Sequence, residues 1–488
     1  LVVQKGDKMQ LNYEGLGFKC GLEIHQQIAG KKLFCNCPVI DTVETDIRVV
    51  RKLRATAGED GEIDVAAQFE MAKDKRFIYV SNSKSTCLVE YDEEPPHKIN
   101  ENALNSALTV ALLLKADIVD EIQIMRKIVI DGSNISGFQR TALIAIDGKL
   151  ETSKGIVSIP TICIEEEAAQ KIEQKTEYVK YNLDRLGIPL IEIATGTEIK
   201  EPEHAKETAG LIGMVLRSTN SVVRGIGSIR QDVNISINGG ARTEIKGFQE
   251  LRTIPKVIDY EIKRQQELIL NGEKINEEVR KAEPNLITTF LRPIPGSARL
   301  YPETDILPIR ISKERIEGLK ADLPKLIIER INDIEREYEI SNELAKEIIS
   351  EGKLDQLEQL VSRFRNIEPR FIAHTLITIP KDIKTRFKIE CEKLSLKDFE
   401  GVLMFLNEDK IPREAVIEAL VSICNGENIN IERYSKISDF ELEGEIRKLL
   451  GEKTGLTLSG YMGLLMGKYR GKVEGKRVIE LLRKYIRE

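Results

Sequence analysis

The chain has 488 residues, a length that corresponds to roughly three domains of about 150 residues and excludes a short peptide or a single small module. Lysine and arginine number 73 against 79 aspartates and glutamates, so the formal net charge at pH 7 is -6. This balance excludes a chain-wide polycation of the histone type. Any contact with nucleic acid must therefore be local.

The sequence carries no sign of a membrane or secretory route. It has no run of about 18 apolar residues that could span a bilayer, and its first residues lack the basic-then-apolar order of a signal peptide. We therefore expect a cytoplasmic protein without a membrane partner.

Up to about residue 310 the pattern is that of short strands, which Gly, Asn and Asp interrupt. Helices are expected in only three places: over 102–115, after Pro202, and over 255–271, the last two with a proline near the first turn. Because strands dominate and helices are inserted irregularly, a mixed or antiparallel sheet is favoured over a doubly wound parallel one. The predicted fold class is α+β.

Beyond about residue 311 the periodicity becomes helical, with apolar residues at three- and four-residue spacing. Helices are expected over 323–338, 342–351, 353–364, 397–407, 413–423 and 439–450. Residues 453–488 contain more Lys and Arg than Asp and Glu, which makes a basic stretch inside an acidic chain. We expect this part of the chain to be all-helical.

The first chemical signal is the stretch GFKCGLEIHQQ at 17–27. If it is a strand, Leu22 and Ile24 face one side while Glu23 and His25 face the other. A carboxylate and an imidazole that project together could form half of a metal site. The spacing is equally typical of an edge strand with a polar outer face.

Acidic side chains interrupt two further apolar runs. In CIEEEAAQK (163–171) three acids follow a strand, although burial of an unpaired carboxylate is costly. The alternative there is a helix N-terminus, where acids suit the helix dipole. In GIPLIEIATGTE (187–198), Glu192 is either on a solvated face or buried with a partner, and Mg²⁺ prefers such oxygen ligands.

A polar hairpin is expected at 229–251. Alternation puts Asp232 and Asn234 on one face of its first strand, and after a Gly-Gly turn Glu244 and Lys246 share a face of the second. Two such strands can line a wet cleft, or they can form a hairpin that faces solvent.

A pair of basic residues, Arg126 and Lys127, lies in the expected strand IMRKIVI. The pair resembles a phosphate clamp. Its alternative is a charged edge strand that blocks aggregation.

Cysteine is sparse in the chain, and only Cys35 and Cys37, in LFCNCP, lie close together. A structural zinc normally takes four ligands, and Cys87, Cys20 or His97 could complete the set. No second close cysteine pair exists, so reduced thiols are the alternative to a single Zn²⁺ clip.

Six motifs in one order give the chain a specific resemblance: GLEIHQQIAGKKLFCNCP, RATAGEDGEIDVAAQFE, YDEEPPHKIN, YNLDRLGIPLIEIATGTEI, SIRQDVNISINGGARTEIKG and RPIPGSARLYPETDILPI. They resemble the E-type subunit of archaeal glutamyl-tRNA(Gln) amidotransferase, which is a cousin of the bacterial B-type subunit. The resemblance runs from about Leu16 to the C-terminus. The Gln-Gln after EIH, the EEPPH segment and ARLYPETD favour the E type over the B type.

The resemblance implies the second step of indirect glutaminyl-tRNA synthesis. ATP would phosphorylate the γ-carboxyl of glutamate attached to tRNA(Gln), and ammonia would then displace phosphate. The ammonia would come through a channel from a separate, asparaginase-like D-type subunit, in a dimer of heterodimers. The nucleic-acid partner would be tRNA, not DNA.

For the site, the resemblance implies Mg²⁺ held by Glu23, His25, Glu166 and Glu192 in a cradle-shaped catalytic domain. These four residues and Lys127 would be catalytic. Candidates to hold ATP or the tRNA end are Arg126, Lys127, Asp232, Asn234, Glu244 and Lys246.

The domains expected by resemblance are the catalytic cradle at 10–310, a helical linking domain at 311–392 and a tRNA-binding tail at 393–488. E-type subunits carry an insertion resembling an aspartyl-tRNA synthetase domain just before the R-P-[IL]-P-G motif, but residues 281–291 leave no room for it. This departure puts tRNA discrimination by that insertion in doubt. Two other hypotheses remain: a bacterial B-type subunit that works with a Ser-Ser-Lys amidase, and a non-catalytic tRNA-binding scaffold.

Overall fold

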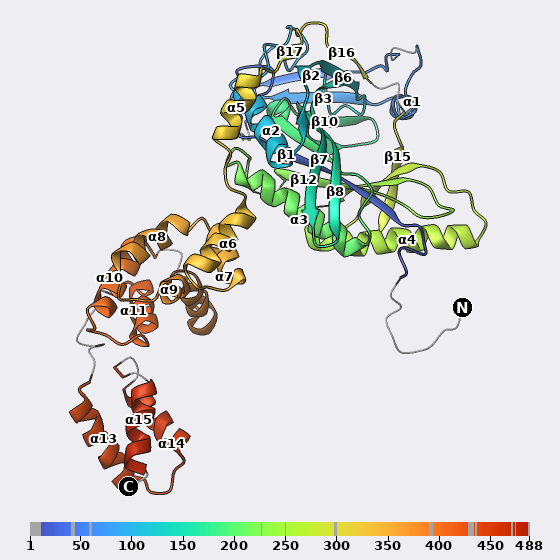
Figure 1. Cartoon of the computed structure of the whole chain (residues 1–488). Coiled ribbons are helices and arrows are strands. Elements are labelled where there is room, and N and C mark those ends of the chain that lie inside the picture. The colour runs from blue at the N-terminus through green and yellow to red at the C-terminus, as the bar shows by residue number, and fades with distance from the viewer. Residues whose placement is uncertain are drawn as a thin grey trace. The chain divides into compact units, whose positions relative to one another are not determined.

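The computed structural model of the chain describes residues 11–40, 44–57, 61–225, 227–248, 250–296, 300–389, 394–427, 434, 437–469, 472–473 and 475–486. The chain divides into two compact units, Leu1–Leu326 and Ile327–Glu488 (Figure 1).

The first unit is built on a large mixed sheet of eleven strands, in which neighbours are antiparallel except for the parallel pair β13 and β14. In spatial order its strands are β15 (Thr288–Pro293), β14 (Glu278–Ala282), β13 (Thr243–Phe248), β12 (Ile229–Ser236), β1 (Lys19–Gln27), β11 (Pro189–Ala194), β8 (Gly155–Glu166), β7 (Phe138–Thr152), β6 (Ile124–Ile128) and β16 (Leu300–Pro302), with β4 (Asp117–Ile118) paired to β7. Residues far apart in sequence therefore meet on the central strands β12, β1, β11 and β8.

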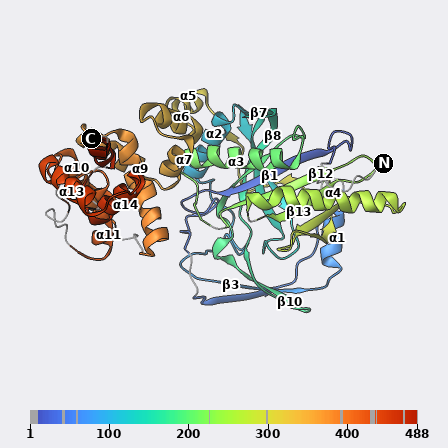
Figure 2. The same ribbon diagram turned by 90° about the horizontal axis from the view of Figure 1, so that it is seen from below.

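Three helices pack on one face of this sheet: α2 (Glu101–Leu113), α3 (Pro202–Ser218) and α4 (Ile254–Leu270). Figure 2 shows α3 and α4 lying across the strands. Asn100 caps α2 by accepting from Asn102 N and Ala103 N, and α3 begins with a proline, as helix starts favour.

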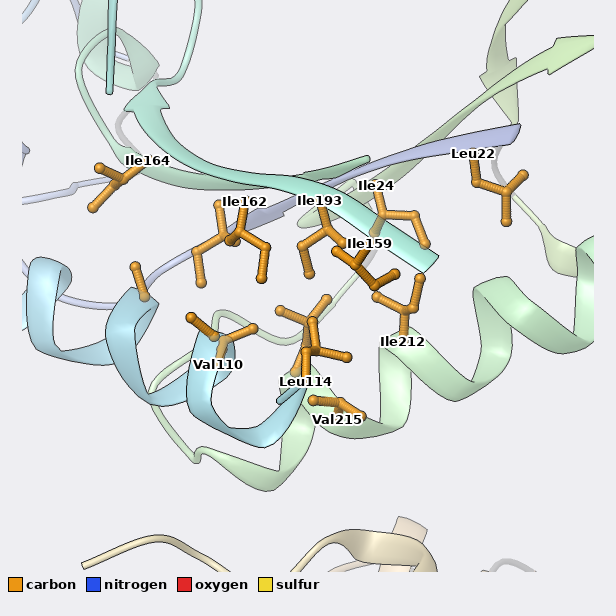
Figure 3. Packing of buried hydrophobic residues seen from close by; sticks show 14 of the residues in the cluster. Leu22, Ile24, Val110, Leu114, Ile159, Ile162, Ile164, Ile193, Ile212 and Val215 are labelled. Carbon is orange, nitrogen blue, oxygen red and sulfur yellow. The ribbon is translucent and has the colours of Figure 1, made fainter. Parts of the chain in front are cut away.

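The main apolar core fills the layer between helices and sheet (Figure 3). Leu22 and Ile24 of β1 and Ile193 of β11 lie in one cluster with Val110 near the end of α2 and Ile212 of α3, all at most 1% exposed. Burial of each such side chain contributes about 2 kcal/mol. Because these residues alternate along their strands, the residues between them must point to the opposite face.

Smaller elements complete the first unit. A four-stranded sheet contains β2 (Ile47–Arg51), β3 (Arg76–Ser81), β10 (Tyr178–Asn182) and β9 (Gln170–Gln174), and β17 (Ile309–Arg310) pairs with β5 (Glu121–Ile122). The helices α1 (Val65–Met71) and α5 (Lys313–Ala321) and two 3₁₀ turns, Leu183–Arg185 and Leu251–Thr253, lie in the connections.

The described part of the second unit is helical and has two apolar clusters. The first cluster involves α6 (Ile327–Glu337), α7 (Asn342–Ser350), α8 (Leu354–Arg363), α9 (Pro369–Asp382), the π-helical turn Ile383–Phe387, α10 (Leu396–Asn407) and α11 (Ala415–Cys424). The second involves α13 (Asp439–Glu452), α14 (Leu458–Lys468) and α15 (Gly475–Ile486).

The α+β prediction is confirmed: a sheet-rich part precedes a helical one. The three helices predicted in the first part correspond to α2, α3 and α4, but the expectation of only three was wrong, because α1 is a further short helix there. The domain boundaries expected near 310 and 392 stay predictions, and the second falls at 390–393, outside the described residues. Among the helices described, none is long and apolar enough to cross a membrane.

Candidate active site

The face of the large sheet opposite the helices carries the polar side chains. In β1, Leu22 and Ile24 are buried in the core, so Glu23 and His25 project from the other face. In β11, Ile191 and Ile193 face the core, which leaves Glu192 on the same side as His25. The register confirms this placement, because His25 and Glu192 are directly opposed.

Three of these side chains form what we call the His-Glu-Glu group: His25, Glu165 and Glu192. One potential ligand atom from each lies within 4.8 Å of the others. His25 Nε2 is 3.4 Å from Glu192 Oε2 and 3.8 Å from Glu165 Oε1. Lys127 Nζ from β6 donates to Glu165 Oε2 at 2.7 Å and lies 3.5 Å from Glu192 Oε2.

The electrostatics of this group reflect burial and close charges. Burial raises the pKa of Glu165 in spite of the adjacent Lys127 ammonium. For Glu192, burial is outweighed by Lys127 and His25, so its pKa lies below the usual range. Burial by itself would lower the pKa of His25, but the hydrogen bond to Glu192 and the two carboxylates raise it. The carboxylates thus favour positive charge at this point of the sheet.

A second cluster, the acidic group, contains Glu23, Asp232 and Glu244. Lys246 bridges it, with Nζ at 2.6 Å from Asp232 Oδ2 and 2.5 Å from Glu244 Oε1. Burial and repulsion by Glu244 raise the pKa of Glu23. Asn234 donates from Nδ2 to Glu23 Oε1 at 3.1 Å. Asp232, Asn234, Glu244 and Lys246, which the sequence predicted for the cleft, therefore belong to one network with Glu23.

Both groups line one cleft of about 1080 Å³. Its wall also includes Glu167, Arg230, Arg242 and residues of the segment 291–296, among them Arg292. The cleft therefore combines carboxylates that can hold a cation with basic side chains that can contact an anion.

Glu166 is not brought to the His-Glu-Glu group. It follows Glu165 on β8 and therefore points to the other face, where Arg140 N and Nη1 donate to it at 3.1 and 3.4 Å. The neighbouring Glu165 takes the place in the group that the sequence prediction gave to Glu166.

Arg126 is also directed away from the cleft. It is opposed to Arg140 in the β6–β7 register, and it forms a bidentate pair with Glu303 at 2.6 and 2.8 Å. Its guanidinium carbon lies 4.5 Å from the ring centre of Phe138. Lys127, the next residue, faces the cleft because side chains alternate along the strand.

The predicted cysteine clip is assembled from two separate loops. Cys35, Cys37 and Cys87 come together with Glu90, one ligand atom of each within 4.8 Å. Cys35 Sγ donates to Glu90 Oε1 at 2.8 Å, while Glu90 Oε2 accepts from Cys87 N at 2.7 Å. Burial and the Glu90 carboxylate raise the pKa of Cys87 to about 12. Three thiols and a carboxylate are a donor set suited to zinc.

The other residues considered for this clip lie elsewhere. Cys20 is buried in the main core, and His97 pairs with Glu94 at 3.5 Å.

The sequence interpretation missed Glu165, Glu90, Glu167 and Arg230. A signal for Glu165 was present, since Ile162 and Ile164 both face the core and period-two alternation then turns Glu165 away from it. Glu90 carried no comparable signal, because its contact with Cys35 depends on how two loops meet.

A family comparison covers the sheet-rich part of the chain. Residues 18–317 match the model of the family described as "GatB/GatE catalytic domain". That range contains the whole large sheet, the His-Glu-Glu group and the acidic group.

Curated relatives resemble nearly the whole chain. A protein of Methanocaldococcus jannaschii is 37% identical over 630 aligned positions, which cover 98% of this chain and 100% of the relative. One of Saccharolobus solfataricus is 36% identical (97% of this chain, 98% of the relative), and one of Thermococcus sibiricus 34% identical (99% of each). All three are named as the E-type subunit of glutamyl-tRNA(Gln) amidotransferase, and the chain belongs to this amidotransferase family.

Proposed function

We propose that this chain converts Glu-tRNA(Gln) to Gln-tRNA(Gln) in an ATP-dependent reaction in the cytoplasm. In the first step a γ-carboxylate oxygen of the tRNA-borne glutamate attacks the γ-phosphorus of ATP, and the bond to ADP breaks. In the second, ammonia attacks the acyl carbon of the γ-glutamyl phosphate, inorganic phosphate leaves with the bonding electrons, and the nitrogen loses a proton. The products are the amide, ADP and phosphate.

The observation that carries the proposal is the His-Glu-Glu group beside Lys127 in the cleft. Its two carboxylates supply the hard oxygen ligands that Mg²⁺ prefers, and the imidazole adds one nitrogen. We assign the metal to His25, Glu165 and Glu192, with Glu23 on the adjacent position of the same strand face. When bound there, Mg²⁺ would neutralise negative charge on the transferred phosphoryl group.

The chain's own side chains have further roles in this proposal. Lys127, held by Glu165, orients that carboxylate and contributes positive charge at the cleft floor. Asp232, Asn234, Glu244 and Lys246 keep Glu23 in place through their shared network. Arg126, bound to Glu303 on the other face, is assigned no contact with ATP.

The partners follow from the family resemblance. We assign the ammonia supply to an asparaginase-like D-type subunit in a dimer of heterodimers, and the E-type name of the relatives favours this over a B-type pairing with a Ser-Ser-Lys amidase. We assign tRNA contact to the helical second unit, where the described part of α15 carries Lys476, Arg477, Arg483 and Lys484. Basic side chains of this kind contact phosphates. The basic stretch predicted at 453–488 includes residues 470–471, 474 and 487–488, which lie outside the described part.

The lengths of the relatives support the absence of an inserted domain. The alignment with the Methanocaldococcus jannaschii protein has 630 positions, 142 more than the 488 residues of this chain. At the expected place, residues 281–291, a short turn joins β14 to β15, in which Glu283 N donates to Ile287 O at 2.9 Å. We propose that tRNA recognition here proceeds without that insertion.

A zinc clip is a separate proposal for the cysteine cluster. Cys35, Cys37, Cys87 and Glu90 would hold Zn²⁺ and join the loop after β1 to the loop after β3. The buried Lys32, 3.4 Å from Glu90 Oε1, would offset part of the ligand charge.

The test of the main proposal uses the purified chain with its ammonia-supplying partner, ATP, Mg²⁺ and Glu-tRNA(Gln). We expect Gln-tRNA(Gln) to form, and His25→Ala or Glu192→Ala to abolish its formation while tRNA binding persists. Unchanged turnover in both variants would reject the site. Binding of tRNA without any ATP hydrolysis stimulated by Glu-tRNA(Gln) would instead favour the non-catalytic scaffold.

A further inference from the structure

Arg230 stands next to the His-Glu-Glu group on the cleft side of the sheet. It belongs to β12 and is directly opposed to His25 of β1 in the register. Directly opposed residues of antiparallel strands point to the same face, with Cβ atoms about 5 Å apart. Lys127 approaches the same group from β6 and reaches Glu165 of β8 across β7. The group is therefore flanked by an arginine on one side and a lysine on the other.

A buried carboxylate anchors Arg230. Arg230 Nη2 donates to Glu167 Oε1 at 2.7 Å, and Glu167 is fully buried. The same carboxylate accepts from Ala168 N at 3.1 Å through Oε1 and from Gln27 Nε2 at 3.1 Å through Oε2. Ala168 N and Gln27 Nε2 thus hold Glu167 in place, and its hydrogen bond to Nη2 ties the guanidinium to this part of the cleft wall.

This anchor leaves part of the guanidinium facing the cleft. The side chain of Arg230 is 41% exposed and lines the cleft wall, although one of its nitrogens is engaged. A guanidinium is a rigid fork of five N–H donors that matches two oxygens of one oxyanion. Fixed by Glu167, this fork loses little conformational freedom when an anion binds.

The surroundings define the anion. The cleft lining carries more carboxylates than Lys and Arg side chains, and Glu165, Glu192 and Asp232 lie on the wall near Arg230, so a simple anion is disfavoured there. An anion that carries its own divalent cation fits this wall, because the carboxylates would bind the cation while Arg230 binds the anion. A magnesium-bound polyphosphate has this chemistry.

We propose that Arg230 binds a terminal phosphoryl group of Mg·ATP and that Glu167 is its positioning residue. This assignment rests on the proposed function, since it names residues for the nucleotide of that reaction. As the bond between the γ-phosphorus and ADP breaks and the bond to the glutamate oxygen forms, Arg230 stays in contact with the transferred oxygens. Glu167 acts only through Arg230.

The experiment uses the full chain and four variants: Arg230→Met, Arg230→Lys, Glu167→Gln and, as a matched control, Arg310→Met. Arg310 is an arginine of the same unit whose side chain is 89% exposed. Binding of Mg·ATP is measured by calorimetry, and KM and kcat are measured separately for ATP and for Glu-tRNA(Gln) in the complex with the ammonia-supplying partner. Melting temperature and Mg²⁺ binding without nucleotide report on folding and on the metal site.

We expect Arg230→Met to weaken Mg·ATP binding about 10- to 100-fold, as the loss of a charge-assisted fork predicts. Arg230→Lys should recover only part of this loss, because it keeps the charge but not the fork. Glu167→Gln should raise KM for ATP about 10-fold, with KM for Glu-tRNA(Gln) unchanged. Arg310→Met should behave as wild type.

Other outcomes overturn the proposal. If Arg230→Met changes only melting temperature, Arg230 merely neutralises Glu167. If it raises KM for Glu-tRNA(Gln) and not for ATP, the anion is the substrate carboxylate and not phosphate. A wild-type chain that binds Mg·ATP through Arg230 but makes no Gln-tRNA(Gln) would reject the proposed reaction and keep this site, whereas a wild-type chain that binds no Mg·ATP rejects both.

Discussion

Glu165 and Glu166 are adjacent in the chain but face opposite sides of the sheet. Glu165 accepts from Lys127 beside His25 and Glu192, whereas Glu166 accepts from Arg140 on the other side. We therefore expect Glu165 to act in the cleft and Glu166 to contribute to the stability of the fold. Substitution of each by glutamine preserves shape and removes one charge.

We expect Glu165→Gln to lower Mg²⁺-dependent formation of Gln-tRNA(Gln) by about 100-fold, a typical loss when the surroundings of a metal are altered. Glu166→Gln should instead lower the free energy of unfolding by about 1–3 kcal/mol, because Arg140 loses a charged partner, and leave Mg²⁺ affinity unchanged. Kinetic assays, Mg²⁺ titration and urea unfolding of both variants measure this. Equal losses of activity in the two would contradict the assignment of Glu165.

The cysteine group gives a second prediction at this scale. Elemental analysis of the purified chain should find about one zinc per molecule, and Cys87→Ser should lose it. Cys424→Ser is the control, because Cys424 lies on α11 in the other unit. A wild-type chain that stays free of zinc after exposure to excess Zn²⁺ would leave the four groups as an ordinary hydrogen-bonded cluster.

At the scale of elements, one carboxylate joins three strands. Glu303, which follows β16, is 1% exposed and accepts from Arg126 of β6 and Arg140 of β7. Burial by itself would raise its pKa, but Arg126, the Asp305 backbone N–H and Arg140 lower it. The ionised carboxylate therefore stabilises this edge of the sheet.

The sign of the pH dependence follows from the lowered pKa. Glu303 contributes its full stabilisation above its unfolded pKa, about 4.3, and the contribution disappears as the pH falls through the lower folded value. We expect Glu303→Gln to cost about 3 kcal/mol of unfolding free energy at pH 7, with the difference from wild type shrinking below about pH 4. Urea unfolding from pH 3 to 7 measures it, and a difference that stays constant over this range would contradict the prediction.

At the scale of the whole molecule, the two units have separate apolar cores. Ile193 belongs to the core of the first unit and Leu376 to that of the second, and each is fully buried. Removal of such side chains costs about 2–5 kcal/mol, partly because a cavity remains.

We expect calorimetry to resolve two unfolding transitions. Leu376→Ala should lower the temperature of one transition and Ile193→Ala that of the other. A single transition that shifts equally in both variants would show that the units unfold together.

Much of the polar face of the large sheet was predictable from the sequence. Alternation along β1 and β11 turns Glu23, His25 and Glu192 away from their apolar neighbours, because a strand has period two, but it left a solvated face as the alternative. Their common role as metal ligands was implied by the family resemblance. The same rule, applied to Ile162 and Ile164, would have selected Glu165 instead of Glu166. Arg126 was predicted to share a phosphate clamp with Lys127 because the two are adjacent in the chain. Side chains alternate along a strand, so the two point to opposite faces.

The sequence by itself determined the α+β class, the change from strands to helices, the family and most of the carboxylates, because these depend on local periodicity and on motifs of contiguous residues. Only the tertiary structure decided which acids meet: Glu165 with His25, Glu90 with three cysteines, and Glu167 with Arg230. Those contacts depend on strand order and register and on where loops meet, as in the register of β1 with β12, which opposes His25 to Arg230. The physical reason is that a side chain's partners are set by the packing of whole elements, whereas its direction from the strand is set by the backbone next to it.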